Sequence, residues 1–306
     1  MKDETAGDPI SGLKWTRKTT EKLADELRAF GIDVSARTVC RLLKKLKFSL
    51  RVNRKQLSNC TAPPEERNQQ FENIALIRQN CACAGTPLIS VDTKKKEKIG
   101  RFKNDGTAWG QKDRPVNDHD FPSLATGIFV PYGIHDLLAN RASVFAGTNY
   151  DTPAFAVENI EKWWRYTGQY TYSGKHHLTI LADGGGSNSC RSRAWKYHLQ
   201  HKLCDPYNLT VTVAHYPSGC SKWNPIERQL FSRISANWKG IPLETYETAL
   251  NYIRTTTTQA GLQVKAYIVR KRYPTGEKFS DEQMDHLNLT RSEILPKWNY
   301  TLHPSP

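Results

Sequence analysis

Three acidic residues stand at the ends of predicted structural elements, where carboxylates can do chemistry. Asp92 follows the apolar run 88–91, and Asp183 follows the apolar run 178–182. Glu227 lies in the first turn of a helix predicted after a fifth strand. Proteins of the α/β class bind ligands at the carboxyl ends of their strands. If the two runs form neighbouring strands, Asp92 and Asp183 meet at one sheet edge, and a helix that enters from that edge can add Glu227.

Together, these three carboxylates indicate a metal-dependent reaction. Carboxylates within a few ångströms of one another repel unless a cation neutralises them. Ligand sets made of oxygen alone suit Mg²⁺ or Mn²⁺. Two such ions about 4 Å apart would clamp the attacking and leaving oxygens of a phosphodiester. Each acid also has a purely structural interpretation, since Asp before Gly is a common turn signal and Glu favours the first turn of a helix. Spacing alone leaves both interpretations open.

The runs that carry these acids belong to an α/β pattern. Three predicted strands, a helix, and then strands that alternate with helices indicate a mixed sheet flanked by helices. The predicted strands are 88–91, 128–130, 142–146, 178–182, 209–214 and 262–269. The predicted helices cover 155–164, 191–201, 225–238 and 245–260. The remaining tail is expected to be mostly irregular.

The N-terminal part of the chain has a helical period. Two short apolar stripes are separated by Gly31, which suits a left-handed stop, and by Ser35, which is a good N-cap for the second helix. Two helices joined by a short turn that contains glycine are typical of a helix-turn-helix. The apolar positions of the two helices are Leu23, Ala24, Leu27, Phe30, Val39, Leu42, Leu43 and Leu46.

The chain is strongly basic, and much of that charge lies in the same segment. Lys and Arg number 44 against 30 Asp and Glu, a net charge of +14. Residues 14–55 hold 13 basic and 4 acidic residues. Such a charge favours a polyanionic partner, most often nucleic acid. We expect residues 48–55 to form a short basic wing. The alternative to a DNA-binding helix-turn-helix is an ordinary two-helix cap with a solvated basic face. The residues of the second helix expected to contact DNA are Arg37, Arg41, Lys44 and Lys45.

The composition disfavours several classes of protein. The apolar runs are too short to span a bilayer, and the N-terminus lacks the apolar stretch of a signal peptide. Seven cysteines, an odd number with no C-x-x-C spacing, argue against a disulfide framework and favour a reducing cytoplasm. We therefore expect a cytoplasmic protein that binds DNA and no membrane.

Two further groups are expected to lie near substrate DNA. Lys94, Lys95 and Lys96 follow Asp92 and would contact phosphates beside the acids; the alternative is a solvated loop. Asn188 follows a run of glycines and would orient a phosphate or a water molecule; the alternative is a partner in a helix N-cap. Both groups would extend the acidic site into a surface for the DNA backbone.

The sequence around the three acids resembles the motifs of the Rhodopirellula-type DDE transposases of bacterial insertion sequences. The segments that carry the resemblance are 91–97 (VDTKKKE), 182–188 (ADGGGSN), 215–217 (HYP) and 221–227 (SKWNPIE). Segments 273–276 (YPTG) and 298–300 (WNY) also match. The resemblance runs from about residue 8 to the C-terminus.

The resemblance implies an RNase H-like catalytic domain in which Asp92, Asp183 and Glu227 are catalytic and bind two Mg²⁺ or Mn²⁺ ions. It implies a transposase that cuts DNA at element ends and joins them to target DNA, as a homo-oligomer associated with the bacterial nucleoid. The expected domains are a helix-turn-helix DNA-binding segment (1–60), a linker helix (61–86), the catalytic domain (87–240) and a C-terminal extension packed on it (241–306).

Two features depart from the family's pattern. Members usually carry a further helix-turn-helix region before this one, so we expect this chain to begin partway in. The segment 218–220 reads Ser-Gly-Cys where Pro-Gly-Thr is expected, which would alter only a loop. The alternatives to a transposase are a truncated, non-catalytic DNA-binding inhibitor of transposition and an RNase H-like nuclease without strand transfer.

Overall fold

The computed structural model describes residues 5–7, 14–16, 18–50, 62–108, 110–111 and 113–306. The chain divides into two compact units, residues 1–57 and 58–306. In the smaller unit, β1 (Thr5–Gly7) pairs antiparallel with β2 (Lys14–Thr16). Two helices follow, α1 (Thr20–Ala29) and α2 (Ala36–Lys45). Both helices of the predicted helix-turn-helix are therefore present.

Local signals fix the ends of these two helices. The side chain of Thr19 caps α1, and that of Ser35 caps α2 by accepting the N–H of Thr38 at 3.2 Å. Gly31 adopts a left-handed conformation with φ of 81°, as predicted for the stop after α1. Residues 48–50 of the predicted wing form no strand, and residues 51–55 lie outside the described residues.

The predicted apolar faces of α1 and α2 are only partly buried. Leu23, Ala24 and Val39 form the core of this unit. Phe30 is 76% exposed and Leu46 is 67% exposed, so these two positions of the predicted apolar faces lie outside that core. Among the described residues of this unit, α1 and α2 pack on each other, and Phe30 and Leu46 are the residues that follow their last turns.

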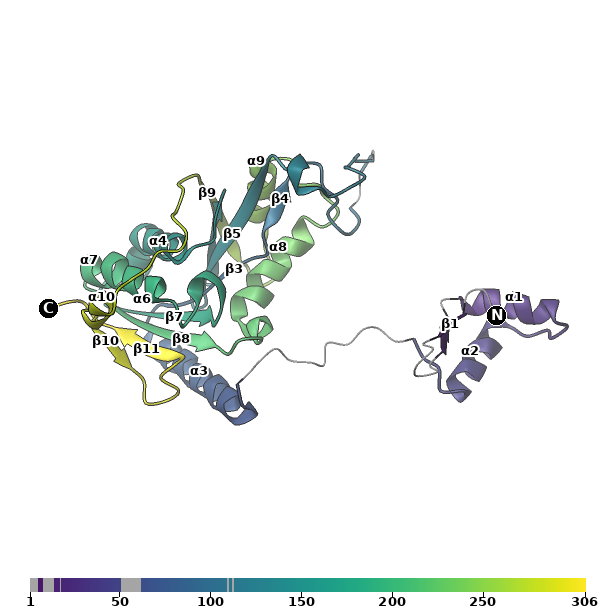
Figure 1. Ribbon diagram of the computed structural model, residues 1–306, viewed down its shortest axis with the longest axis horizontal. Helices are drawn as coiled ribbons and strands as arrows, with labels where there is room; N and C mark the ends of the chain where they lie inside the picture. The colour runs from purple at the N-terminus through teal and green to yellow at the C-terminus, as the bar shows by residue number, and fades with distance from the viewer. Residues whose placement is uncertain (1–4, 8–13, 17, 51–61, 109, 112) are drawn as a thin grey trace. The chain divides into compact units, whose positions relative to one another are not determined.

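The larger unit is built on a mixed sheet of nine strands in the order β10-β11-β8-β7-β3-β5-β6-β9, with β4 paired to β5 (Figure 1). Each of the six predicted strands corresponds to one of them. The strands are β3 (Leu88–Thr93), β4 (Glu97–Ile99), β5 (Gly127–Asp136), β6 (Arg141–Gly147), β7 (His177–Asp183), β8 (Thr210–Tyr216), β9 (Gln263–Val269), β10 (Leu289–Arg291) and β11 (Asn299–Leu302).

The directions of the central strands define the fold class. β5 runs antiparallel to both β3 and β6, whereas β7 runs parallel to β3 and β8 runs parallel to β7. The order β6-β5-β3-β7-β8, with three antiparallel strands followed by two parallel ones, is the RNase H-like arrangement. The predicted mixed α/β fold is confirmed.

The C-terminal part of the chain closes both edges of this central sheet. β9 pairs in parallel with β6, and β11 pairs antiparallel with β8 and carries β10 on its outer side. The tail after β9 is mostly irregular, as expected, and the regular elements in it are the short helix at 281–285 and the strands β10 and β11. β10 and β11 have three and four residues, too few to show an alternating pattern, and β11 pairs with a strand far away in the sequence.

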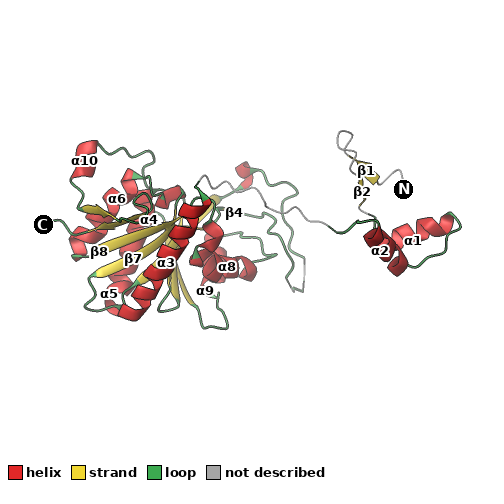
Figure 2. Ribbon diagram, turned by 90° about the horizontal axis from the view of Figure 1, so that it is seen from below, coloured by secondary structure: helices red, strands yellow, loops and turns green. Residues whose placement is uncertain are grey.

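Helices cover both faces of the sheet. On one face, α4 (Pro153–Trp163) and α6 (Arg193–Leu199) pack on alternate residues of the central strands. On the other face, α3 (Pro64–Ala84) lies across β7 and its neighbours (Figure 2). The turn η6 (Glu227–Phe231), α8 (Ser232–Asn237) and α9 (Tyr246–Arg254) cover the remaining strands of that same face. The shorter helices are α5 (Gln169–Thr171), α7 (Asp205–Tyr207) and α10 (Asp281–Asp285).

The helix predicted at 61–86 is confirmed as α3. Pro64 lies in its first turn, and Gly85 ends it in a left-handed conformation with φ of 59°. Its buried residues, Ile74 and Cys81, pack on the sheet in one cluster with β3, β7 and β8. α3 therefore forms part of the larger unit, on the sheet face that also carries η6 and α8.

Candidate active site

The carboxyl ends of β3 and β7 bring Asp92 and Asp183 together. The two strands are parallel neighbours, and Val91 pairs with Ala182, so the aspartates are the next residues in register. Neighbouring strands lie about 4.8 Å apart, and side chains alternate between the two faces. This alternation puts both aspartates on the face covered by α3 and η6. The prediction that their strands are neighbours is confirmed.

Both aspartates are bonded to the backbone and partly withdrawn from water. Asp92 accepts the N–H of Thr93 at 2.8 Å, and Asp183 accepts the N–H of Gly184 at 2.7 Å. Burial, followed by the charge of Asp183, raises the pKa of Asp92 well above its ordinary value. Burial also raises the pKa of Asp183, against the effect of its bond to Gly184. Such carboxylates favour a nearby cation, which stabilises their charged form.

The helix that carries Glu227 is bonded directly to β3. The buried Asn224 side chain accepts the hydroxyl of Ser90 and donates to the carbonyl of Val91 at 3.3 Å. The same Ser90 oxygen accepts the N–H of Ile226 at 3.2 Å. These three bonds tie Asn224 and Ile226 to β3 and fix the start of η6, which begins at Glu227, against the strand.

A glycine lets this helix approach the sheet closely. Gly133 of β5 pairs with Asp92 in the antiparallel register. A Cβ atom at position 133 would lie 2.6 Å from the Phe231 ring and 2.8 Å from Ile226 Cδ1, closer than such atoms pack. Both side chains are buried in the core beneath η6. The absent side chain at position 133 therefore helps to set how near Glu227 comes to the aspartates.

Glu227 begins η6, the turn that covers the sheet face on which both aspartates lie. η6 is a π-helical turn, and such turns are rare and occur often at functional sites. Burial raises the pKa of Glu227, the charge of Lys94 opposes that rise, and the charge of Asp183 adds to it.

The three carboxylates do not form a closed cluster in the protein alone. Among the residues that the structure describes, no group of three or more His, Cys, Asp or Glu side chains stands close enough to hold a metal ion. Like charges repel, so a closer approach requires a cation between them. The donor set fits Mg²⁺ or Mn²⁺, because it consists of carboxylate oxygens from three elements at one sheet edge. Convergence of these oxygens to ligand distance stays a prediction.

The run of lysines after β3 contains one buried and two exposed side chains. Lys94 is 8% exposed; its ammonium bonds Glu97 at 2.9 Å and lies 4.6 Å from the centre of the Trp238 ring. The expectation that Lys94 contacts DNA does not agree with this geometry, because its charge is engaged inside the protein. Lys95 and Lys96 are exposed, and their contact with DNA stays a prediction.

Asn188 is held inside the protein rather than at the surface. It ends the turn η3 (Gly186–Asn188), is 1% exposed, and accepts the Tyr132 hydroxyl at 3.0 Å. The expectation that it orients a phosphate or a water molecule does not agree with this burial. Gly184, which opens the loop, is required for close approach, because a Cβ there would lie 2.9 Å from the carbonyl oxygen of Tyr216.

A buried polar network connects the end of β7 to β8 and β11. His215 of β8 bonds the carbonyl of Asp183 at 3.1 Å through Nδ1 and the hydroxyl of Tyr300 at 3.0 Å through Nε2. Trp195 Nε1 donates to the same hydroxyl at 2.9 Å. Burial lowers the pKa of His215 to about 4, so the ring is neutral at pH 7. Because Tyr300 belongs to β11, the C-terminal extension takes part in positioning Asp183.

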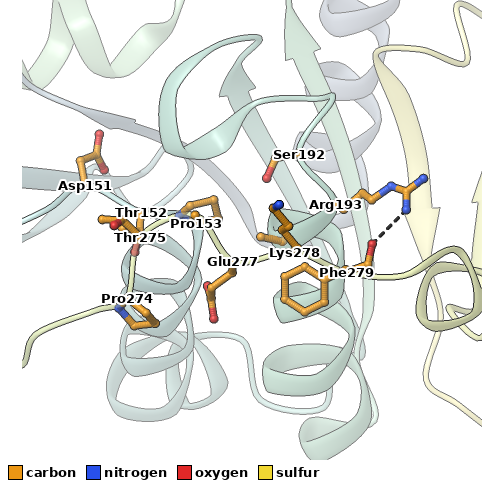
Figure 3. Close-up of a pocket in the computed structure, with 12 residues that line it drawn as sticks. Asp151, Thr152, Pro153, Ser192, Arg193, Pro274, Thr275, Glu277, Lys278 and Phe279 are labelled. Carbon is orange, nitrogen blue, oxygen red and sulfur yellow. Dashed lines mark hydrogen bonds between the residues drawn. The ribbon is translucent and has the colours of Figure 1, made fainter.

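A fourth carboxylate, Asp151, lies at the same sheet edge, and the sequence pattern does not indicate it. Its Oδ1 accepts the hydroxyl of Thr93 at 3.1 Å, and its charge raises the pKa of Asp92. It lines a cavity of about 630 Å³ together with the start of α6 and the loop 274–279 (Figure 3). Because Asp151 precedes the Thr-Pro start of α4, its position is typical of an ordinary helix start, and no local signal marks it as part of a site.

The basic side chains expected to contact DNA in the smaller unit are exposed. They lie on α2, whose last turn is basic and whose first turn has no acidic residue. Their contact with DNA stays a prediction. These exposed residues are Arg37, Arg41, Lys44 and Lys45.

Comparison with known proteins identifies one family. A family model described as the Rhodopirellula transposase DDE domain matches residues 1–304. No curated relative matches the sequence. Within the described part of the chain, no helix is both long and apolar enough to cross a membrane.

Several solved structures with a similar chain trace are complexes of the Mos1 transposase. The mariner Mos1 paired-end complex with Mg matches with a TM-score of 0.47 at 12% identity, over 77% of this chain and 65% of that chain. The paired-end complex with Mn has a TM-score of 0.44 at 14% identity, over 77% and 65%. The strand transfer complex has 0.45 at 13%, over 77% and 64%. This chain thus spans somewhat less than two thirds of the length of the proteins in these complexes.

Proposed function

The chain belongs to the Rhodopirellula transposase DDE domain family, and from this premise we propose that it is an active transposase of a bacterial insertion sequence. It cuts DNA at the element ends and joins them to target DNA by divalent-metal-dependent phosphoryl transfer. The observation that carries the proposal is the register of β3 and β7, in which Asp92 and Asp183 are adjacent, with Glu227 bonded to the same strand through its helix.

Each acidic residue has a distinct role in this proposal. Asp92 and Asp183 hold one divalent ion between them, and Glu227 shares a second with one of the aspartates. The chemistry that Mg²⁺ or Mn²⁺ supplies there is stabilisation of negative charge on the phosphodiester as the bond breaks. The protein supplies the geometry, through the paired strands and through the bonds that Asn224 makes to β3.

DNA is the partner of both units in this proposal. The segment 1–60 holds the element ends through the exposed basic residues of α2, and Lys95 and Lys96 contact phosphates beside the acids of the catalytic domain 87–240. The helix at 61–86 and the extension 241–306 support that domain. The protein works as a homo-oligomer on DNA, in the cytoplasm at the nucleoid.

The proposal is tested with DNA that contains the element ends. Strand cleavage and gel-shift affinity are measured on the same DNA with Mg²⁺ or Mn²⁺. Asp183→Asn keeps the shape of the side chain but removes its charge, so cleavage should fall on the order of 10³-fold or more while binding is retained. The matched control is Asp285→Asn, which removes an exposed carboxylate from α10.

The outcomes separate the three functional classes. Wild-type cleavage and joining that Asp183→Asn abolishes supports the transposase. Cleavage without joining favours an RNase H-like nuclease. If wild type binds the ends tightly and cleaves nothing, even when extended upstream, the protein is a non-catalytic inhibitor. Equal cleavage by wild type and Asp183→Asn contradicts the assignment of the acids.

A further inference from the structure

Asp151 occupies a position between the two loops that begin at the catalytic aspartates. It lies between β6 and α4 in the chain, at the edge of the cavity that Figure 3 shows. Its Oδ1 accepts the hydroxyl of Thr93, the residue after Asp92, at 3.1 Å. The Thr93 hydroxyl also lies 3.5 Å from the hydroxyl of Ser187, in the loop that follows Asp183, and Ser187 lowers the pKa of Asp151. Asp151 and the Thr93 hydroxyl therefore link the end of β3 to the loop after β7.

The contacts of Asp151 differ from those of an ordinary residue at a helix start. An Asp before a helix commonly caps it or interacts with its positive end. In this protein the neighbouring Thr152 caps α4, by accepting the N–H of Phe155 at 3.2 Å. The carboxylate of Asp151 instead accepts the hydroxyl of Thr93, the residue after Asp92, and that hydroxyl also approaches Ser187. Capping of α4 therefore does not account for the position of the Asp151 side chain.

The charge of Asp151 acts on the catalytic acids. It raises the pKa of Asp92 and that of the buried Tyr132. Among the described residues, no Lys or Arg forms an ion pair with Asp151, and Lys96 acts on it only through its field. The edge of β3 and β7 therefore carries a fourth negative charge that no ion pair of the described protein balances.

Asp151 can be reached from solution. The cavity of about 630 Å³ beside it is also lined by Ser192 and Lys278, and Asp151 stands at its margin (Figure 3). Water and small ions can therefore enter from the α4 side of the sheet, opposite the side that Glu227 covers. A divalent cation held between Asp92 and Asp183 would lie within the field of Asp151.

We propose that Asp151 is a fourth acidic residue of this site, a positioning residue whose negative charge strengthens divalent-cation binding by Asp92 and Asp183. The inference rests on the function proposed above. Asp151 acts through its bond to the Thr93 hydroxyl and through its field, because no cluster of ligands that includes it exists among the described residues. This arrangement separates its charge, which attracts the cation, from its bond, which holds the end of β3.

The test uses the full chain without DNA, and counts free Mn²⁺ by electron paramagnetic resonance during a titration. Asp151→Asn keeps an oxygen that accepts the hydroxyl of Thr93 but removes the charge. The Kd for Mn²⁺ should rise about tenfold, because one unit charge a few ångströms away contributes on that order. Thr93→Val keeps the charge and removes one bond, and should change the Kd less than about threefold.

The matched control is Asp136→Asn. Asp136 is a buried aspartate at the C-terminal end of β5, where it pairs with Ile89 near the start of β3. It accepts hydrogen bonds from the N–H groups of Leu138 and Ala139. Its Mn²⁺ Kd should equal that of wild type. An unchanged Kd in folded Asp151→Asn, or an equal rise in Asp136→Asn, overturns the inference.

A second variant distinguishes failure of this inference from failure of the proposed function. Asp183→Asn should lose both Mn²⁺ binding and DNA cleavage. If Asp183→Asn loses both and Asp151→Asn loses neither, only the inference about Asp151 fails. If wild type binds no Mn²⁺, or Asp183→Asn binds and cleaves like wild type, the metal site fails and takes this inference with it.

Discussion

The two units of the chain are stabilised in different ways. The smaller unit has a core cluster of Leu23, Ala24 and Val39, and its helices begin at local caps. The larger unit packs both faces of a nine-stranded sheet. Its candidate site depends on distant partners, such as Ser90 and Asn224, which are 134 residues apart. Two helices formed by local signals are therefore enough to present the basic side chains of the smaller unit. Bringing the three carboxylates together instead requires packing between segments far apart in the sequence.

This contrast predicts that catalysis and DNA affinity can be removed separately. The largest effect is expected for Glu227→Gln, which removes one carboxylate charge and leaves α2 untouched. Cleavage of end-containing DNA should fall on the order of 10³-fold or more, because stabilisation of the reacting phosphate depends on the cation that Glu227 helps to hold. Gel-shift affinity should stay within about twofold of wild type.

The matched control for this variant is Glu293→Gln, an exposed glutamate outside the site. Its cleavage rate should equal that of wild type. A comparable loss in the control would point to net charge rather than to the site. A large loss of DNA affinity in Glu227→Gln would show that DNA affinity and catalysis are not assigned to separate units as we propose.

Gly133→Val tests whether packing alone positions Glu227. The new side chain would meet Ile226 and Phe231 and push η6 away from β3. We expect cleavage to fall about 100-fold, as misplacement of about 1 Å can cause, and the free energy of unfolding to fall by about 1–3 kcal/mol.

A second substitution beneath η6 checks the cause of that loss. Phe231→Leu in the Gly133→Val background makes room for the added side chain, so the double variant should recover part of the lost rate. Kinetics of all four proteins in this double-mutant cycle measure the coupling. Strictly additive effects would contradict the packing argument.

The smaller unit should control the dependence of binding on salt. Replacing Arg41, Lys44 and Lys45 by Ala removes up to three phosphate contacts, so the slope of log affinity against log salt should fall by about 2–3. Affinity near physiological salt should drop about 10- to 100-fold, with an unchanged cleavage rate at saturating DNA. A control that replaces Lys175, Lys265 and Lys297 by Ala removes equal charge from the larger unit. An equal change of slope in that control would contradict the assignment of DNA binding to the smaller unit.

The smallest effect concerns Glu158, which ties the C-terminal extension to α4. Tyr273 donates to its carboxylate at 2.9 Å, and the ammonium groups of Lys271 and Lys162 pair with it. Burial acts to raise the pKa of Glu158, but these hydrogen bonds outweigh burial and lower that pKa to about 2. The stabilisation is therefore present above about pH 4.5, where the unfolded group is ionised, and is lost as pH falls toward 2.

Thermal unfolding at pH 7 and at pH 3 measures how much the interactions of Glu158 stabilise the folded protein. Glu158→Gln should cost about 1–2 kcal/mol at pH 7, after discounting for solvent screening, and less at pH 3. The pKa of the folded group lies below the ordinary value of 4.5, which fixes this direction. A penalty that grows toward acid pH would contradict the assigned sign.

The sequence predicted the parts of the site that depend on regular elements. The ends of β3 and β7 were predictable because both strands are buried apolar runs, and parallel neighbours present their carboxyl ends at one edge. Asn224 and Ser90 were not, because their bond joins two segments 134 residues apart. Lys94 resembles its neighbours Lys95 and Lys96 in the sequence, and only the approach of Trp238 makes it a buried residue.

The features that sequence patterns missed share one physical cause. Asp151 reaches the site from a helix start, and its role depends on how α4 lies on the sheet. β11 is four residues long and pairs with β8 through contacts that no local period records. In the smaller unit the opposite holds, since caps and turns are local signals, and both helices begin where Thr19 and Ser35 place them.

The pairing of the sheet edges has a consequence for synthesis of the protein. β6 and β8 receive their outer neighbours only from residues 263–302, after all three acids have left the ribosome. A reading frame interrupted between Glu227 and the start of β9 at Gln263 would keep Asp92, Asp183 and Glu227 but leave two open strand edges and no Tyr300. Open edges recruit other chains. Such a truncated product would aggregate during translation instead of competing for element ends as a soluble repressor.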